Sequence, residues 1–333
     1  MSIYLDLKNS KDYIKLQEAS NIIKAGGIVL FPTETVYGIG ADCFNEQAVK
    51  KVFQAKGRDF HNPINLLVSS IDMVNMVAKN ISDLEYSLMK AFFPGPFTLI
   101  LSKKDTIPSI VTAGQSTVGV RMPDNEIALK LVEYSGVPLA TPSANLSGKP
   151  SGTLFQNVYD DFNDKVDCLI DGGNSSIGIE STIVKVIDNV PHILRPGAIT
   201  AEQIRAVAGN VINDFSASPS DSLKHYSLNS KSILVYSSNN ALMISKIIEI
   251  ASNYKNPIII SQSKNIDNYK NFHFIDIGND MNSIAYNIFK ALKEADTYNS
   301  DIIIIEGIEQ QGLGTAIMNR LIKACDNNFI VVS

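Results

Sequence analysis

Short apolar runs alternate with segments of helical spacing over the first 200 residues of the chain. Apolar runs predict buried strands at 28–31, 64–68, 97–102, 117–122, 168–170 and 181–187. Helical spacing predicts helices between several of these strands, at 13–25, 46–55, 83–92 and 125–135. This pattern predicts a mixed α/β domain over residues 13–200.

The pattern changes after this domain and then resumes. Residues 209–230 are rich in Ser, Asn and Asp and poor in periodic apolar positions, so we place a linker over 201–230. Beyond it, strand-like runs such as SILVYS, PIIIS and DIIIIEG alternate with helical spacing. Residues 231–333 are therefore predicted to form a smaller, Rossmann-like α/β domain with a mostly parallel sheet.

The composition is that of a folded protein with small partners. Hydrophobic residues make up 45% and charged residues 19% of the 333 residues, far from the composition of disordered chains. The net charge of −5 provides no global basic field for nucleic acid. The three cysteines are far apart in sequence, the N-terminus lacks a signal-peptide pattern, and no apolar stretch is long enough to span a membrane. We therefore expect a reducing, cytoplasmic location.

Two polar segments follow predicted apolar elements and are candidates for ligand binding. PTETVYG, at 32–38, places two threonines and Glu34 directly after a strand, where side chains often bind ligands; a Pro-initiated turn whose hydroxyls bond local backbone is the alternative. Lys56 and Arg58 end a predicted helix. They suit a polyphosphate as a compact charge and a bidentate fork, or they complement the helix dipole.

Further candidates close other predicted strands. Ser143 and Asn145 lie two apart in a loop rich in hydroxyl and amide groups, so they can offer neutral donors to a phosphate or ribose; an Asx-type or capping loop is the alternative. Arg121 and Arg195 each need water, an anion or a structural carboxylate as partner. No nucleophile and base stand together, which favours binding of an anionic nucleotide over covalent catalysis.

Standard nucleotide and metal motifs are absent from the sequence. Gly148 and Lys149 are followed by Pro150, which breaks a P-loop, and Ile317 stands where a dinucleotide fingerprint needs glycine. The four histidines show no metal-ligand spacing, and we expect no structural metal.

The ordered segments PTETVYG, KGR with NP, FFPGPFTLIL, VRMP, PSANLSG, IESTIV and LRPG resemble the YrdC-like threonylcarbamoyl-adenylate synthases in their long, two-domain form. The resemblance covers residues 13 to about 200, and GLGTAIMNRLIKA at 312–324 is similar to the second domain of that form. It implies a YrdC-like mixed-sheet catalytic domain and a nucleotidyltransferase. The implied reaction condenses L-threonine, bicarbonate-derived carbon dioxide and ATP into L-threonylcarbamoyladenylate, with release of pyrophosphate. The product would serve N6-threonylcarbamoyladenosine formation at position 37 of tRNAs that read codons starting with A.

The resemblance also implies the residues of the site. The family pattern K-x-R with S-x-N matches Lys56, Arg58, Ser143 and Asn145, which would hold the ATP phosphates and the nucleotide. Lys56 and Arg58 would act catalytically through positioning and charge neutralisation, with Mg2+ beside the phosphates. Further ATP contacts are implied for Asn62, Thr117, Ser151 and Arg195, and threonine contacts for Thr35, Arg121, Thr141 and Ser181. Tyr226, in the linker's KHYS, resembles the family tyrosine that folds over the nucleotide, so linker and second domain are expected to act as a lid.

One residue departs from the family pattern. Many members carry a histidine beside the threonine site, where this chain has Leu67. The departure removes a polar contact worth ~0.5 to 1.5 kcal/mol, and we expect either modest threonine affinity or a compensating contact from Asn65.

Partners and rival functions follow from the same resemblance. The product is expected to be released or handed to the tRNA threonylcarbamoyl transferase complex, with at most weak RNA binding and no membrane association. A non-catalytic double-stranded RNA-binding module is the alternative function, and the net charge of −5 counts against it. Hydrogenase-maturation carbamoyltransferases share a similar module but add an acylphosphatase domain and CxxC zinc motifs, neither of which occurs in this sequence.

Overall fold

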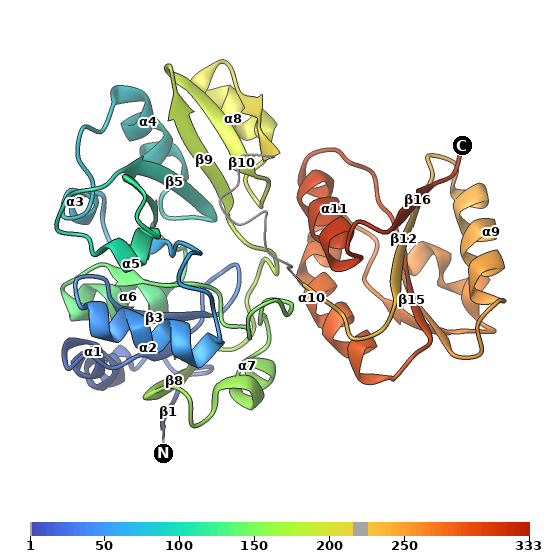
Figure 1. Cartoon of the computed structure of the whole chain (residues 1–333), viewed down its shortest axis with the longest axis horizontal. Coiled ribbons are helices and arrows are strands. Elements are labelled where there is room, and N and C mark those ends of the chain that lie inside the picture. Colours follow the sequence, from blue (N-terminus) through green and yellow to red (C-terminus); the bar gives the residue numbers. More distant parts are fainter. Residues whose placement is uncertain (1, 216–225) are drawn as a thin grey trace. The chain divides into compact units, whose positions relative to one another are not determined.

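The computed structural model describes residues 2–215 and 226–333, and the chain divides into two compact units (Figure 1). Unit 1 holds nearly all of residues 2–215, and unit 2 holds 226–333 together with Gly148–Pro150 and Ile177–Ile179. Each unit has its own sheet and its own apolar core. Within the described residues, no helix combines the length and the apolar character needed to cross a membrane.

Residues 2–215 build a mixed sheet of eleven strands in the order β1-β8-β2-β3-β7-β4-β6-β5-β9-β10-β11. Parallel pairs such as β5–β9 stand beside antiparallel pairs such as β9–β10, which confirms the mixed sheet expected from the sequence. The strands are β1 (Ile3–Asp6), β2 (Val29–Phe31), β3 (Gly38–Asp42), β4 (Leu66–Leu67), β5 (Phe97–Ser102), β6 (Thr117–Arg121), β7 (Leu139–Ala140), β8 (Cys168–Asp171), β9 (Thr182–Ile187), β10 (Val190–Arg195) and β11 (Ile212–Asn213).

Helices bury both faces of this sheet. On one face α1 (Leu16–Lys24) packs against α6 (Glu126–Ser135), and their apolar residues join Phe31 and Leu67 in one core cluster. On the other face α2 (Glu46–Lys56) contributes to a second cluster that includes Leu66. Neighbouring residues of one strand enter different clusters because side chains alternate between the faces. The other helices of unit 1 are α3 (Ile71–Val74), α4 (Asp83–Phe92), α5 (Ser109–Thr112), α7 (Phe155–Phe162) and α8 (Ala201–Ala208).

The structure differs from the predicted domain limits at both ends of unit 1. β1 precedes residue 13 and pairs in parallel with β8. The segment 201–230, predicted as linker, begins with α8, whose capping box joins Thr200 and Gln203, and with β11, which pairs with β10. The Thr-x-x-Gln signal stands before a short amphipathic run that composition alone did not distinguish from linker. Residues 216–225 of the predicted linker lie outside the described residues.

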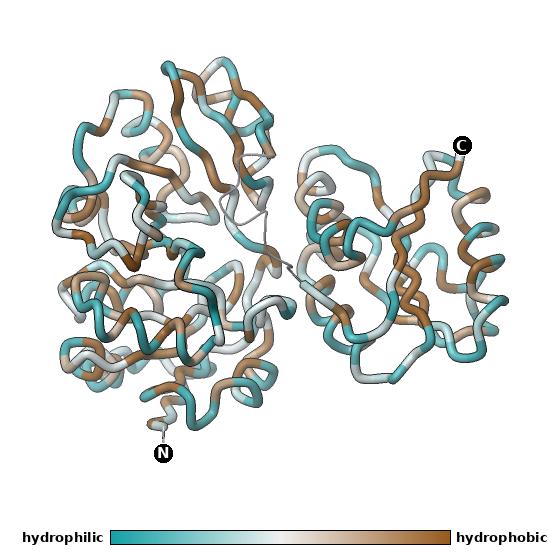
Figure 2. The backbone as a smooth tube through the Cα atoms, viewed as in Figure 1, coloured by the Kyte–Doolittle hydropathy of each residue, from teal (hydrophilic) through white to brown (hydrophobic). Residues whose placement is uncertain are grey.

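The sheet of unit 2 is entirely parallel over the described residues, in the order β14-β13-β15-β12-β16. Its inner strands β13 and β15 are apolar runs that are buried along their whole length, and the strands of this unit include brown segments in Figure 2. Such runs are typical of strands covered on both faces. The elements are β12 (Ser232–Tyr236), α9 (Asn240–Ala251), β13 (Pro257–Ser261), β14 (His273–Asp276), α10 (Met281–Thr297), β15 (Ile302–Glu306), α11 (Leu313–Ala324) and β16 (Phe329–Val331). The Rossmann-like α/β arrangement expected from the sequence is confirmed.

Candidate functional site

The end of helix α2 positions two cations. The helix begins at Asn45, whose side chain accepts hydrogen bonds from the backbone N–H groups of Gln47 and Ala48. It ends at Gly57, which adopts the left-handed conformation at φ 61° that glycine accepts without a steric cost. Lys56 is therefore the last helical residue, and Arg58 is the first residue after the turn.

Lys56 joins the helix end to the Ser143–Asn145 loop. Its ammonium is buried and donates to the backbone carbonyls of Ser143 and Asn145, the latter at 2.6 Å. Its Nζ also lies 3.4 Å from Oδ1 of Asn145. Burial, with a smaller repulsion from Arg58, lowers the pKa of Lys56 well below its usual value. The structure thus brings together the K-x-R and S-x-N segments that the sequence pairs only by resemblance.

Arg58 is anchored by its own loop. Its Nε donates to the carbonyl of Asn62 at 3.3 Å and its Nη2 to the carbonyl of Pro63 at 2.9 Å. Burial lowers the pKa of Arg58 to about 10, which leaves it charged at neutral pH. Asn62 is itself buried. A buried ammonium and a half-buried guanidinium, both hydrogen-bonded to neutral oxygens, form a local attraction for an anion.

A second polar cluster forms where β5, β9 and β10 meet. Ser181 Oγ lies 2.7 Å from Thr98 Oγ1, and Arg195 donates through Nη2 to the Ser181 carbonyl at 2.8 Å. Ser151 donates to Oε1 of Glu180 at 2.7 Å. Ser181 and Arg195, both expected in the site, are therefore bonded to each other with Thr98 beside Ser181, and Ser151, also expected, is bonded separately to Glu180.

Asn65 connects this cluster to Thr141. Its backbone carbonyl accepts from the N–H of Thr141 at 2.8 Å. Its side-chain Oδ1 would be 2.2 Å from a Cβ placed on Gly119, which also faces Thr98. Gly119 is thus required because Asn65 fills the space that a side chain would need. Asn65 and Thr98 therefore both face Gly119, and the compensation of Leu67 by Asn65 stays a prediction.

Gly119→Ala is expected to lower the free energy of unfolding by about 1 to 3 kcal/mol, because the added methyl group overlaps Asn65. Urea denaturation followed by circular dichroism measures the change. The double variant Asn65→Ala/Gly119→Ala removes the overlap and should recover most of the loss. A single variant as stable as the wild type would contradict this packing.

Arg121 pairs with a carboxylate from the PTET segment. Its Nη2 lies 2.7 Å from Oε2 of Glu34, and both side chains are almost completely buried. Nε of Arg121 donates to the Gly95 carbonyl at 3.3 Å. Leu67 on β4 stands in register with Arg121 on β6. Its side chain is buried in the apolar cluster and offers no polar contact. The structural carboxylate that the sequence analysis kept open as a partner for Arg121 is thus Glu34.

Hydrogen bonds of residues around Glu34 fix the backbone of the PTET turn. Thr33 Oγ1 donates to the carbonyl of Val36 at 2.6 Å and lies 3.0 Å from Thr35 Oγ1, and Thr35 is fully buried. The local-turn interpretation is therefore correct for Thr33. Ser176 donates to the backbone carbonyl of Glu34 at 3.4 Å.

Two expected site residues lie apart from these contacts. Thr117 stands in register with Ser102 at the beginning of β6, and Arg121 ends the same strand. Tyr226 belongs to unit 2, where its ring stacks on Phe289 with centroids 5.1 Å apart. The sequence analysis assigned no role to Thr98 or Glu180. Glu180 stands in the IEST motif and Thr98 in FFPGPFTLIL, so motif membership was the signal that pointed to both.

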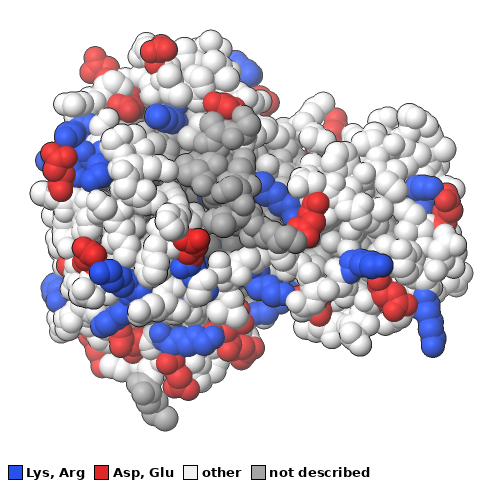
Figure 3. Space-filling view, in the orientation of Figure 1, with Lys and Arg blue, Asp and Glu red and all other residues white. Residues whose placement is uncertain are grey.

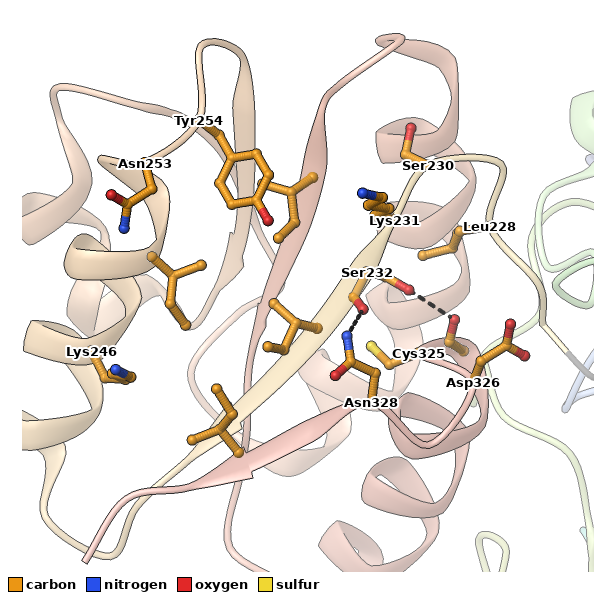
Figure 4. A pocket seen from close by; sticks show the side chains of 15 residues that line it. Leu228, Ser230, Lys231, Ser232, Lys246, Asn253, Tyr254, Cys325, Asp326 and Asn328 are labelled. Atoms are coloured by element: carbon orange, nitrogen blue, oxygen red, sulfur yellow. Dashed lines mark hydrogen bonds between the residues drawn. The ribbon is translucent and has the colours of Figure 1, made fainter.

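A separate hollow lies in unit 2, at the amino ends of β12, β15 and β16 (Figure 4). It has a volume of about 530 Å³, and its lining includes Ile233, Ile302, Lys231, Tyr254 and Asn328. Ligands of open α/β sheets bind at the carboxyl ends of the strands, so this position is not that of a typical ligand site. In the part of the chain that the structure describes, no group of three or more His, Cys, Asp or Glu side chains is arranged to hold a metal ion.

Comparison with known proteins gives the site its context. A family model described as telomere recombination, for Sua5, YciO and YrdC proteins, matches residues 21–197. A second model, threonylcarbamoyl-AMP synthase C-terminal domain, matches residues 199–325. A threonylcarbamoyl-AMP synthase of Pyrococcus abyssi is 39% identical, with 100% of each chain covered. The chain belongs to the threonylcarbamoyl-AMP synthase family. It is thus an enzyme of the two-domain form, in agreement with the resemblance seen in the sequence.

Other relatives of the threonylcarbamoyl-AMP synthase family support the full-length match. The synthase of Bacillus subtilis is 36% identical over 95% of this chain and 94% of its own. Among solved structures, P. abyssi Sua5 complexed with L-threonine is 38% identical, covers 100% of both chains and has a TM-score of 0.92. These matches extend over both domains.

Proposed function

We propose that this protein synthesises L-threonylcarbamoyladenylate from L-threonine, bicarbonate-derived carbon dioxide and ATP, releasing pyrophosphate. The product would serve N6-threonylcarbamoyladenosine formation at position 37 of tRNAs that read codons starting with A, which implies a cytoplasmic enzyme. The observation that carries the proposal is the full-length likeness to P. abyssi Sua5 complexed with L-threonine. The hydrogen-bonded polar clusters of unit 1 support it.

The ATP phosphates are assigned to the cations around the end of α2. Lys56 is buried, Arg58 beside it is half-buried, and Lys56 is already bonded to Ser143 and Asn145. Phosphate oxygens can replace these neutral acceptors because charge-assisted bonds are stronger. Arg195, Ser151, Asn62 and Thr117 are assigned to the remaining nucleotide contacts, and Tyr226 to a covering role.

Threonine is assigned to the neighbouring polar groups. Arg121 is proposed to hold its carboxylate, and Thr35, Thr141 and Ser181 its other polar groups. Carboxylation of the amine gives a carbamate, whose oxygen attacks the α-phosphate of ATP while pyrophosphate leaves. Bringing two anions together is the difficult part, so charge neutralisation and positioning by Lys56, Arg58 and Arg195 contribute most. Magnesium is proposed to arrive with ATP and to remain bound to phosphate oxygens and water.

Pyrophosphate release from ATP with magnesium and bicarbonate tests the proposal. L-Threonine, L-serine and no amino acid are compared, each with and without bicarbonate. Release that requires both threonine and bicarbonate is the expected result. Release that is absent, or indifferent to the amino acid, would overturn the assignment.

ATP affinity is expected to weaken as pH rises, because only protonated Lys56 attracts phosphate. The pKa of Lys56 is lowered in the free enzyme, so above that pKa each ATP must bind together with a proton, and affinity falls by up to about tenfold per pH unit. Arg58 stays charged below its pKa of about 10, so a loss of affinity in that range reports on Lys56. Calorimetry in two buffers of different ionisation enthalpy measures both affinity and proton uptake. The Lys56→Arg variant should show neither trend, and a wild type without proton uptake would contradict the lowered pKa.

The RNA-binding alternative has little support from the surface. On the face shown in Figure 3, basic and acidic side chains are interspersed, and the net charge is −5. A duplex-binding module needs a continuous basic surface. Salt-dependent RNA binding without threonine-dependent ATP turnover would nevertheless favour the RNA-binding alternative.

Transfer of the adenylate to the tRNA-modifying complex remains part of the proposal.

A further inference from the structure

The contact between Glu34 and Arg121 is incomplete as an ion pair. The two atoms are 2.7 Å apart, yet neither Nη2 of Arg121 nor Oε2 of Glu34 makes a directed hydrogen bond to any described residue. Oε1 of Glu34 is also buried and has no hydrogen-bond partner among the described residues. Glu34 is 5% exposed and Arg121 is 7% exposed. A buried carboxylate that lies beside a cation but accepts no directed hydrogen bond is incompletely compensated for its lost hydration, so this arrangement calls for an additional group.

The missing partners are of two opposite kinds. The carboxylate of Glu34 needs N–H donors, and the guanidinium of Arg121 needs a well-directed anionic acceptor. An α-amino acid carries both, an ammonium and a carboxylate on one carbon atom. The adjacent Leu67 is apolar and cannot serve either group.

We infer that Glu34 binds the α-ammonium group of the amino-acid substrate while Arg121 binds its carboxylate, so that the pair selects a zwitterion. This inference rests on the proposed function, because that proposal assigns Arg121 to the carboxylate of the substrate. The pair carries one positive and one negative charge, and a zwitterion adds no net charge to the buried site. A hydroxy acid without the amine would place its anion beside the anionic Glu34, and an amine without the carboxylate would face Arg121. Both mismatches disfavour the wrong ligand by repulsion and by leaving a buried charge unpaired.

Glu34 is held for this role by the backbone around it. Thr33 donates to the Val36 carbonyl and Ser176 to the Glu34 carbonyl, so these bonds fix the backbone of the turn. The carboxylate oxygens of Glu34 take part in no hydrogen bond among the described residues. A carboxylate with a purely structural role would be expected to use its oxygens to satisfy neighbouring N–H groups.

Glu34→Gln, which keeps the shape and removes the charge, tests the inference. Calorimetry on the full chain compares L-threonine with 3-hydroxybutyrate, which keeps the carboxylate and the hydroxyl but lacks the amine. The wild type should bind threonine more tightly than 3-hydroxybutyrate. Glu34→Gln should weaken threonine binding about 10- to 100-fold and reduce the ratio of the two affinities. Glu133→Gln, an exposed position on α6, is the matched control and should leave both affinities unchanged. Affinity for ATP, with circular dichroism, verifies that each variant is folded, and Glu34→Asp replaces Glu34→Gln if the latter does not fold.

The outcomes separate three cases. If Glu34→Gln weakens both ligands equally, Glu34 only orients Arg121, and the inference is wrong. If Glu34→Gln binds threonine as well as the wild type does, the inference is also wrong, although the synthase assignment stands. If the wild type binds a different α-amino acid more tightly than threonine, and Glu34→Gln weakens that amino acid more than its analogue without the amine, the inference stands and the choice of threonine fails.

Discussion

Lys56→Ala is expected to lower the rate of adenylate formation by about one to three orders of magnitude. The buried ammonium bonds to the carbonyls of Ser143 and Asn145, so it occupies the junction of the two segments assigned to the phosphates. Each charge-assisted bond lost in the transition state is worth ~1.5 to 3 kcal/mol. Arg58→Ala should give a loss of similar size, because its half-buried guanidinium lies beside the same ammonium.

The measurement is threonine- and bicarbonate-dependent pyrophosphate release at saturating ATP. Lys50→Ala is the matched control, since Lys50 lies on the same helix, is partly exposed and pairs with Glu46. It should retain wild-type turnover. Wild-type turnover in both Lys56→Ala and Arg58→Ala would remove these residues from the mechanism.

The elements that position these cations could be predicted from sequence. The helical spacing at 46–55 and the glycine that follows it correspond to α2 and its end at Gly57. Strands β12, β13 and β15 of unit 2 were equally clear because each contains a run of at least three consecutive apolar residues. Local patterns were sufficient wherever an element buries one regular face.

Elements with weak apolar patterns were missed. β3 contains Gly38 and Gly40, which read as turn residues, yet a Cβ at either position would lie 2.7 Å or less from Thr141 or Phe31. The glycines are therefore set by packing against residues distant in sequence. The contact of Glu34 with Arg121 could not be predicted for the same reason: it joins residues that are distant in sequence, and no local pattern determines which strand end meets which turn. Only the choice between an anion and a structural carboxylate could be posed beforehand.

Glu306→Ala is expected to lower the free energy of unfolding of unit 2 by about 3 kcal/mol. Glu306 ends β15 and is fully buried. It accepts hydrogen bonds from Ser261 at 2.5 Å, Gln262 at 2.7 Å and Asn265 at 2.6 Å. The substitution removes the acceptor that these three side chains share. Ser261 Oγ keeps the Gln262 carbonyl at 3.2 Å and Asn265 Nδ2 keeps Asn240 Oδ1 at 3.0 Å, and the cost of burying the carboxylate is also removed.

Glu306→Gln separates the hydrogen bonds from the charge. Its amide oxygen can accept from Gln262 and Asn265, and its NH2 can donate to Ser261 Oγ, so the network survives without the charge. Burial raises the pKa of Glu306, so the folded state favours the protonated form. In the wild type the free energy of unfolding should therefore fall as pH rises from about 4.3 through that raised pKa, and then remain constant.

Glu306→Gln should abolish this part of the pH dependence and be at least as stable as the wild type at neutral pH, whereas Glu306→Ala should be less stable at every pH. Hydrogen exchange of the full chain, followed at the backbone amides of β13 and β15 over the pH series, localises the effect to unit 2. Equal protection in Glu306→Ala and the wild type would mean that the carboxylate does not support these strands. A Glu306→Gln variant with the same pH dependence as the wild type would show that another group titrates. The buried carboxylate is thus expected to stabilise the strand ends through its hydrogen bonds and to destabilise them through its charge, and the two variants measure these contributions separately.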